Sequence, residues 1–154
     1  MSADVGSNAP DFTLMNQDRQ PVTLTALKGK PVVLAFFPAA FSGTCQKELC
    51  TFRDSMAQLN QAQAQVLGIS VDTFFSLKAF QDQQHLNFPL LSDFNKEVIH
   101  DYGVFNEDMI GLKGIAKRAV FVVDQDGVIR YREVLEDARN EPNYQHLFDE
   151  VSRL

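Results

Sequence analysis

The stretch that decides the fold is residues 32–52, which read VVLAFFPAAFSGTCQKELCTF. It begins with a continuous apolar run, residues 32–37, of β-branched, aliphatic and aromatic side chains. Such a run is typical of a central strand that is covered on both faces of a sheet. Pro38 ends the run, and a short loop leads to a helix that we expect over residues 45–63. The stretch therefore predicts a buried strand, a loop and a helix that starts at Cys45.

The rest of the chain alternates strands and helices around this unit. The order predicts an α/β protein with a thioredoxin-like fold, in which an N-terminal β-hairpin extension precedes a central mixed sheet flanked by helices, with right-handed crossovers. The expected hairpin strands are residues 11–16 and 21–27. Further on we expect strands at 65–71 and 89–92, helices at 74–85 and 95–102, a hairpin of 119–123 and 128–134 around a turn at 124–127, and a helix at 142–154 with Pro142 in its first turn.

Size and charge restrict the class of protein. The chain has 154 residues and neither an internal repeat nor a linker, so we expect one domain over residues 1–154. The formal net charge of -6 disfavours nucleic acid and anionic membrane as partners. Residues 1–11 have neither a basic nor an apolar segment, and no later stretch is long and apolar enough to cross a bilayer, so we expect a cytoplasmic protein.

The cysteine and histidine spacings exclude several kinds of site. Two cysteines are too few for a disulfide scaffold, and they do not form a C-x-x-C motif. The three histidines, His85, His100 and His146, lie far from both cysteines and from each other in the sequence. We therefore expect no metal site and no cofactor, and histidines at the surface.

Cys45 lies where the buried strand has ended and the helix begins. Unpaired amides and the helix dipole favour negative charge there, so a thiolate would be stabilised, and the thiolate is the nucleophilic form. Active sites of α/β sheets also gather at the carboxyl ends of strands. A single cysteine is more often a small buried hydrophobe. Packing, however, does not explain a proline, a hydroxyl, a glycine and a helix start together. Cys45 heads the predicted buried stripe of Leu49, Phe52, Met56 and Leu59.

Cys50 follows Cys45 by five residues. It would lie about 140° round the helix, on a side face near Arg53 and Ala57, with its Cα roughly 8–9 Å from that of Cys45. Because a disulfide needs Cα atoms within about 7 Å, the two cysteines can bridge only if the first helical turns unwind. A buried structural cysteine is the alternative for Cys50.

The pattern Pro38-x-x-x-Ser42-x-x-Cys45 resembles the peroxiredoxin signature Pro-x-x-x-Thr/Ser-x-x-Cys. Residues 37–45 and 102–107 most resemble the alkyl hydroperoxide reductase E type. The spacing of Cys45 and Cys50 instead resembles the bacterioferritin-comigratory (peroxiredoxin Q) type. The resemblance covers nearly the whole chain and also includes residues 8–12, 66–72, 88–93, 102–104 and 118–124.

This resemblance implies a thiol peroxidase that reduces hydrogen peroxide and organic hydroperoxides. The Cys45 thiolate would attack the peroxide and become a sulfenic acid. Arg118 would donate to the thiolate and the peroxide, and Ser42 with the amides near Cys45 would hold the peroxide. Pro38 would shield the thiolate from water. Glu48 either orients Arg118 or is a first-turn carboxylate favoured by the helix dipole.

The second half of the reaction is open at this point. Our hypothesis is that Cys50 attacks the sulfenic acid and that thioredoxin or a similar thiol reductant reduces the disulfide. Alternatives are a one-cysteine peroxidase recycled by an external thiol and a peroxide-sensing redox switch. Without a C-x-x-C motif, a disulfide reductase is poorly supported. We expect a loop with Gly103, Gly111 and Gly114 between the helix at 95–102 and the strand at 119–123. Its apolar residues Met109, Ile110, Leu112 and Ile115 would line the peroxide entrance, contact a second subunit or pack under the loop, so a monomer and a homodimer are both open.

Overall fold

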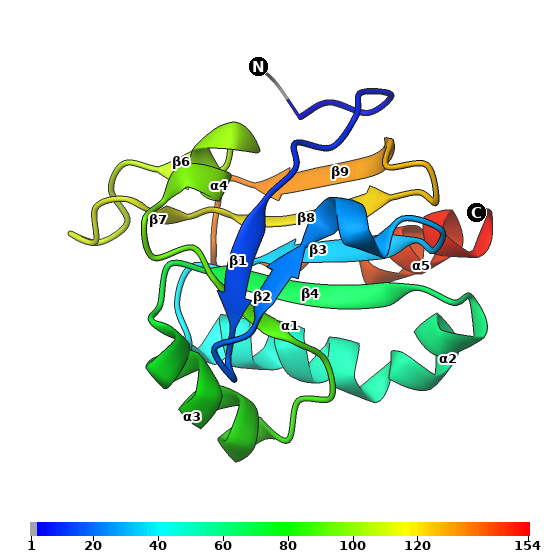
Figure 1. Cartoon of the computed structure of the whole chain (residues 1–154). Coiled ribbons are helices and arrows are strands. Elements are labelled where there is room, and N and C mark those ends of the chain that lie inside the picture. Colours follow the sequence, from blue (N-terminus) through cyan, green and yellow to red (C-terminus); the bar gives the residue numbers. More distant parts are fainter. Residues whose placement is uncertain (1–2) are drawn as a thin grey trace.

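Seven strands form one mixed sheet in the computed structural model, which describes residues 3–154 (Figure 1). Their order across the sheet is β2-β1-β5-β4-β3-β8-β9. Only β3 with β4 and β4 with β5 pair in parallel, and the other neighbours are antiparallel. The strands are β1 (Thr13–Asn16), β2 (Pro21–Thr23), β3 (Val32–Phe36), β4 (Gln65–Ser70), β5 (Leu90–Ser92), β8 (Arg118–Val123) and β9 (Ile129–Leu135). The predicted thioredoxin-like order with an N-terminal hairpin is confirmed.

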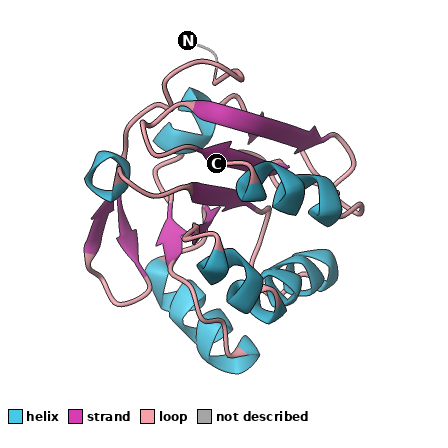
Figure 2. Cartoon of the chain, turned by 90° about the vertical axis from the view of Figure 1, so that its right-hand side faces the viewer, coloured by secondary structure: helices cyan, strands magenta, loops and turns pink. Residues whose placement is uncertain are grey.

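Helices cover both faces of this sheet (Figures 1 and 2). One face packs against α1 (Gly43–Asp54), α2 (Met56–Gln61), α3 (Phe74–Gln84) and α5 (Tyr144–Ser152). The other face packs against the N-terminal segment, the 3₁₀ helix η1 (Leu24–Leu27) and α4 (Glu97–Asp101). The sheet is therefore the middle layer of three.

Strand β3 explains why the run at 32–37 is apolar at every position. Side chains at 33, 35 and 37 belong to the core shared with α1 and α3, whereas those at 32, 34 and 36 belong to the core on the opposite face. Successive residues of a strand point to opposite faces, so a strand between two cores needs apolar residues throughout. Each large side chain buried in this way contributes roughly 1.5–3 kcal/mol.

The helix expected at residues 45–63 is two helices. It begins earlier, at Gly43, and is interrupted at Ser55, whose φ of -100° and ψ of 2° leave the helical region. The backbone N–H of Ser55 donates to the carbonyl groups of Arg53, Phe52 and Thr51. Such shared, shorter-range hydrogen bonds tighten the last turn at the end of a helix. The predicted stripe nevertheless continues past the break, because Leu59 is buried in the same core as Leu49 and Phe52 and the half-buried Met56 packs against that core.

Two boundaries of the predicted elements also differ from those in the structure. The second strand of the N-terminal hairpin stops at Thr23, and η1 follows it. The last helix starts at Tyr144, and Pro142 precedes its N-cap, Asn143, instead of lying in the first turn. The Asn143 side chain accepts a hydrogen bond from the amide of His146, an interaction that alanine or proline at the cap cannot make.

The segment expected to be a loop before β8 contains a second, small sheet. Strands β6 (Phe105–Asn106) and β7 (Ile115–Ala116) pair antiparallel, with the tip of this hairpin between them (Figure 1). Within residues 3–154 there is no helix with the length and hydrophobicity needed to cross a membrane.

Candidate active site

The loop that connects β3 to α1 places Cys45 in the first turn of the helix. Ser42 is the N-cap of α1, and its Oγ accepts a hydrogen bond of 3.3 Å from the amide of Cys45. The Cys45 side chain is completely buried beneath this turn. The sequence thus folds locally as predicted, with a thiol held at the positive end of a helix dipole.

Arg118 approaches Cys45 because of the register of the sheet. Ala119 pairs with Phe36, so the first residue of β8 lies beside the end of β3, where the loop to α1 begins. The guanidinium Nη2 donates to the Cys45 Sγ at 3.1 Å, and Nη1 donates to Glu48 Oε1 at 2.9 Å. The Nε group donates to the carbonyl of Ala138 at 3.1 Å. All three nitrogens are engaged, so the orientation of the guanidinium is fixed.

Glu48 is a carboxyl group in an unfavourable place for a charge. It is fully buried, and its Oε2 has no hydrogen-bond partner among the described residues. Burial raises the pKa of Glu48 from 4.5 to about 7, although Arg118 lowers it. Burial alone would lower the pKa of Arg118, but the nearby Glu48 and Cys45 raise it above its ordinary value. Near neutral pH a guanidinium cation therefore lies between a titrating carboxyl and the thiol.

Two features of this arrangement did not come from the sequence reasoning. The carboxylate of Asp72 accepts the amide of Ala40 at 2.8 Å and the hydroxyl of Ser70 at 2.7 Å, so it ties the β3–α1 loop to the end of β4. The carbonyl of Ala138 is the third acceptor for Arg118. Asp72 follows a buried strand next to β3, and functional residues of α/β sheets gather at such strand ends, so this position could have predicted that Asp72 lies near the site. No sequence signal marks a backbone carbonyl.

A cavity of about 630 Å³ opens in front of this group. Pro38, Ser42 and Arg118 are among the residues that line it, whereas Cys45 and Glu48 are buried behind this lining. Met109 and Ile110, from the tip of the β6–β7 hairpin, also line it. Ile115 is buried, whereas Leu112 is 47% exposed. The apolar residues of this segment therefore divide between the cavity, the core and the surface.

Cys50 lies apart from the cavity. It is half-buried on another face of α1, and its Sγ donates to the side-chain Oε1 of Gln84, at the end of α3, over 3.5 Å. Both cysteines are free thiols. The structure thus brings together five of the six predicted site residues, namely Pro38, Ser42, Cys45, Glu48 and Arg118, and turns Cys50 toward a different partner.

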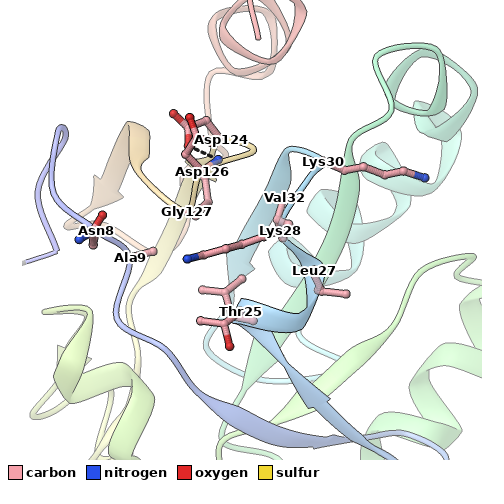
Figure 3. Close-up of a pocket in the computed structure, with 12 residues that line it drawn as sticks. Asn8, Ala9, Thr25, Leu27, Lys28, Lys30, Val32, Asp124, Asp126 and Gly127 are labelled. Carbon is pink, nitrogen blue, oxygen red and sulfur yellow. Dashed lines mark hydrogen bonds between the residues drawn. The ribbon is translucent and has the colours of Figure 1, made fainter.

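A second pocket, of about 190 Å³, lies elsewhere on the molecule (Figure 3). It is built from the N-terminal segment, η1 and the turn between β8 and β9, with Lys28 directed across it. Within the described residues there is no cluster of three or more His, Cys, Asp or Glu side chains arranged to hold a metal ion. His85, His100 and His146 are exposed.

Comparison with known proteins shows the family to which this site belongs. The AhpC/TSA family matches residues 5–132. Alkyl hydroperoxide reductase E of Mycobacterium tuberculosis is 46% identical over 134 residues, which cover 85% of each chain. Peroxiredoxin Q, chloroplastic, of Triticum aestivum is 44% identical over 126 residues, covering 82% of this chain and 57% of that protein.

Solved structures agree with the sequence relatives. Peroxidoxin BcpB from Mycobacterium tuberculosis superimposes with a TM-score of 0.87 at 30% identity and 97% coverage of both chains. A peroxiredoxin-like protein from Aquifex aeolicus gives a TM-score of 0.90 at 27% identity, covering 99% of this chain and 88% of that one. The predicted mixture of reductase E and peroxiredoxin Q features is confirmed by relatives of both kinds. The chain belongs to the AhpC/TSA family of peroxiredoxins and is a thiol-dependent peroxidase.

Proposed function

We propose that Cys45 is the residue that reacts with the hydroperoxide. The observation that carries the proposal is the hydrogen bond from Arg118 Nη2 to the Cys45 Sγ in the first turn of α1. Arg118 also lines the cavity, so this bond joins the buried sulfur to the cavity wall. A fixed cation beside sulfur favours the thiolate, and it also faces the place where the oxygen atoms of a bound peroxide would lie.

In the first step the Cys45 thiolate attacks one peroxide oxygen. A sulfur–oxygen bond forms, the oxygen–oxygen bond breaks, and the second oxygen leaves as alkoxide or hydroxide, which takes up a proton to become an alcohol or water. Cys45 is then a sulfenic acid. Arg118 stabilises the charge that develops on the leaving oxygen, Ser42 orients the first turn of α1, and Pro38, which lines the cavity, shields the sulfur from water.

In the second step Cys50 resolves the sulfenic acid. Its sulfur attacks the Cys45 sulfur, a disulfide bond forms, the sulfur–oxygen bond breaks, and the hydroxyl leaves as water with the proton that Cys50 gives up. An intact α1 keeps the two Cα atoms too far apart for this bond, so the first turns must unwind. A thioredoxin-like dithiol then reduces the disulfide and regenerates both thiols.

A one-cysteine cycle is the second candidate for the resolving half. It is favoured by one observation, namely that the Cys50 Sγ points to Gln84 while the Cys45 Sγ points to Arg118. In that cycle an external thiol attacks the Cys45 sulfenic acid, the sulfur–oxygen bond breaks, water leaves and a mixed disulfide forms. A second external thiol then attacks the mixed disulfide, which regenerates the Cys45 thiol and releases a disulfide of the two external thiols.

The test compares wild type with the variants Cys45→Ser and Cys50→Ser. Each reduced protein is mixed with one equivalent of hydrogen peroxide, peroxide loss is followed by stopped flow, and the products are identified by mass spectrometry. We expect rapid consumption that only Cys45→Ser abolishes, and a Cys45–Cys50 disulfide in the wild type. A Cys45 that reacts no faster than an ordinary cysteine would overturn the assignment. If the Cys50→Ser protein turns over with thioredoxin at the wild-type rate, Cys50 does not resolve the sulfenic acid and the one-cysteine cycle is the correct account.

Domain organisation and location belong to the same proposal. We propose that residues 1–154 act as one domain, which is supported by two cores that share a single sheet. We also propose a cytoplasmic location. Whether the active form is a monomer or a homodimer is decided by sedimentation of the reduced protein.

A further inference from the structure

The turn of α1 that carries Cys50 is fastened to the end of α3. The Cys50 thiol donates to the Gln84 side chain over 3.5 Å, and Arg53 Nη1 donates to the Gln84 carbonyl. In return, Asn87 Nδ2 donates to the Arg53 carbonyl at 3.4 Å. We call these four residues, Cys50, Arg53, Gln84 and Asn87, the α1–α3 clasp.

Gln84 is the centre of the clasp because both its side chain and its carbonyl accept hydrogen bonds from α1. It is the last residue of α3, and His85 after it adopts the left-handed conformation that ends the helix. The carbonyl of Gln84 is one of the last in α3 and has no partner within the helix, so Arg53 satisfies a group that would otherwise need water. The contact thus caps the C-terminal end of α3 and holds α1 against it.

The clasp also fixes the position of the Cys50 sulfur. The thiol donates to the Gln84 Oε1 at the C-terminal end of α3, and Arg53, one turn further along α1, donates to the carbonyl of the same residue. Cys50 therefore lies against α3, in a position from which it cannot reach Cys45 while α1 is intact.

Resolution requires this clasp to open. For Cys50 to attack the Cys45 sulfenic acid, α1 must unwind, and the Cys50 Sγ must leave Gln84. We propose that Gln84 is a positioning residue for the resolving step, holding Cys50 in the folded α1 and so setting how often it reaches the sulfenic acid. The inference rests on the proposed resolving role of Cys50 and adds to it the residue that controls the rate.

The variant Gln84→Met removes the acceptor and keeps a side chain of similar length. The rate of disulfide formation, divided by the rate of Cys45 oxidation, should rise about fivefold, the factor that corresponds to about 1 kcal/mol for one hydrogen bond. A larger excess of peroxide should then be needed to produce sulfinic acid at Cys45, because resolution competes with that second oxidation. Both quantities are measured by quenched flow with thiol blocking and mass spectrometry.

Two further variants separate a positioning role from simple loosening of α3. Gln84→Glu keeps the acceptor, adds an ion pair with Arg53 and places negative charge beside the Cys50 sulfur, so the same ratio should fall below that of wild type. A carboxylate at a helix C-terminus weakens the helix, so loosening alone would raise the ratio instead. Gln83→Met is the matched control, since exposed Gln83 belongs to the same turn but not to the clasp, and it should leave the ratio unchanged.

Failure of this inference and failure of the resolving role give different results. If wild type forms the Cys45–Cys50 disulfide but Gln84→Met and Gln83→Met have the same ratio, Cys50 resolves and the clasp does not control it. If wild type forms no such disulfide, the positioning role falls together with the resolving role. Amide exchange of residues 49–54 in the reduced protein supports the clasp if it is faster in Gln84→Met than in Gln83→Met, and equal exchange in the two overturns it.

Discussion

At the scale of single residues, the site depends on one buried cation that serves two partners. Arg118 is 1% exposed and divides its two terminal nitrogens between the Cys45 sulfur and the Glu48 carboxyl. A lysine could not make this contact, because the fork geometry and the third bond through Nε belong to a guanidinium. The surroundings of the Cys45 sulfur thus depend on a side chain of β8, which is 73 residues away in the sequence.

Removal of this cation should slow the first chemical step. The variant Arg118→Met loses the donor to sulfur and to the leaving oxygen, so we expect the second-order rate constant with hydrogen peroxide to fall about 10²-fold or more. Stopped-flow oxidation of the reduced proteins measures it, with circular dichroism to verify folding. Arg139→Met removes an exposed cation that lines the same cavity but does not contact Cys45, and it should change the rate less than threefold. Equal effects of the two changes would contradict a specific role for Arg118.

The buried Glu48 predicts an unusual pH dependence of stability. Its pKa is about 7 in the folded protein, above the ordinary 4.5, so below about pH 4.5 both states are protonated and burial has no ionisation cost. As the pH rises to 7 the unfolded state gives up its proton first, and above pH 7 the folded state bears the full cost. The free energy of unfolding of wild type, relative to Glu48→Gln, should therefore fall by about 3 kcal/mol between pH 4.5 and pH 8.

Urea unfolding of both proteins at several pH values between 4.5 and 8 tests this difference. Comparing the two chains cancels the carboxyl groups that they share. Glu107→Gln, a change at an exposed residue of the β6–β7 hairpin, is the control and should give a flat difference. A flat difference for Glu48→Gln as well would show that Glu48 ionises in the folded state as it does in a peptide.

At the scale of elements, the first turn of α1 combines a helix cap with the thiol that we propose as the nucleophile. Ser42 caps α1 by accepting from Cys45, and Thr73 caps α3 in the same way by accepting from Ser76. The two caps have the same geometry, with donor–acceptor distances of 3.3 Å in both. Only one of them lies at the cavity.

This pair of caps allows stability and reactivity to be separated. Ser42→Ala and Thr73→Ala should each lower the free energy of unfolding by about 1 kcal/mol. Only Ser42→Ala should also slow the oxidation of Cys45, by roughly tenfold, since the cap fixes the turn that holds the thiol and aims a donor at the peroxide. Ser42→Thr keeps the hydroxyl and should restore the rate. A slower reaction in Thr73→Ala would indicate that loss of stability alone accounts for the effect.

At the scale of the whole molecule, the two cores are joined through β3 and β4, the central strands of the sheet. Gly68 in β4 is the tightest point, because a Cβ there would meet Leu90 Cδ2 at 2.7 Å and the rings of Phe37 and Phe88 at 3.4 and 3.6 Å. Gly68 thus lets β4, β5 and the loop after β3 approach closely. The position of the loop that carries Ser42 depends on this packing.

Gly68→Ala should therefore destabilise the protein although alanine is the smallest possible addition. Overpacking of a filled core costs about 1–3 kcal/mol, and urea unfolding measures the loss. Gly43→Ala is the matched control, since a Cβ at Gly43 meets no atom within 4 Å, and its effect should stay within about 0.5 kcal/mol. A neutral Gly68→Ala would mean that Leu90 can move aside without loss of packing.

Local features of the chain were determined by the sequence alone. The apolar run at 32–37, the proline after it and the cysteine at a helix start follow rules that act over a few residues, and they predicted β3, the loop and the first turn of α1 correctly. The peroxiredoxin signature added the pairing of Cys45 with Arg118, which local rules do not contain. The predictions of one helix up to residue 63 and of a last helix that starts at Pro142 were wrong, because helix boundaries depend on competing hydrogen bonds of similar strength.

Tertiary structure decided what each side chain meets. Sequence left two interpretations of Glu48 open, and only folding showed it fully buried against Arg118 with one oxygen unpartnered. The ties from Asp72 to the loop and from Gln84 to Cys50 join residues more than thirty positions apart. Such contacts arise when the sheet register and the helix packing bring distant segments together, and no periodicity within either segment encodes them. The sequence thus determined the place of the Cys45 thiol at the start of a helix, and the tertiary structure determined the charges and hydrogen bonds around it.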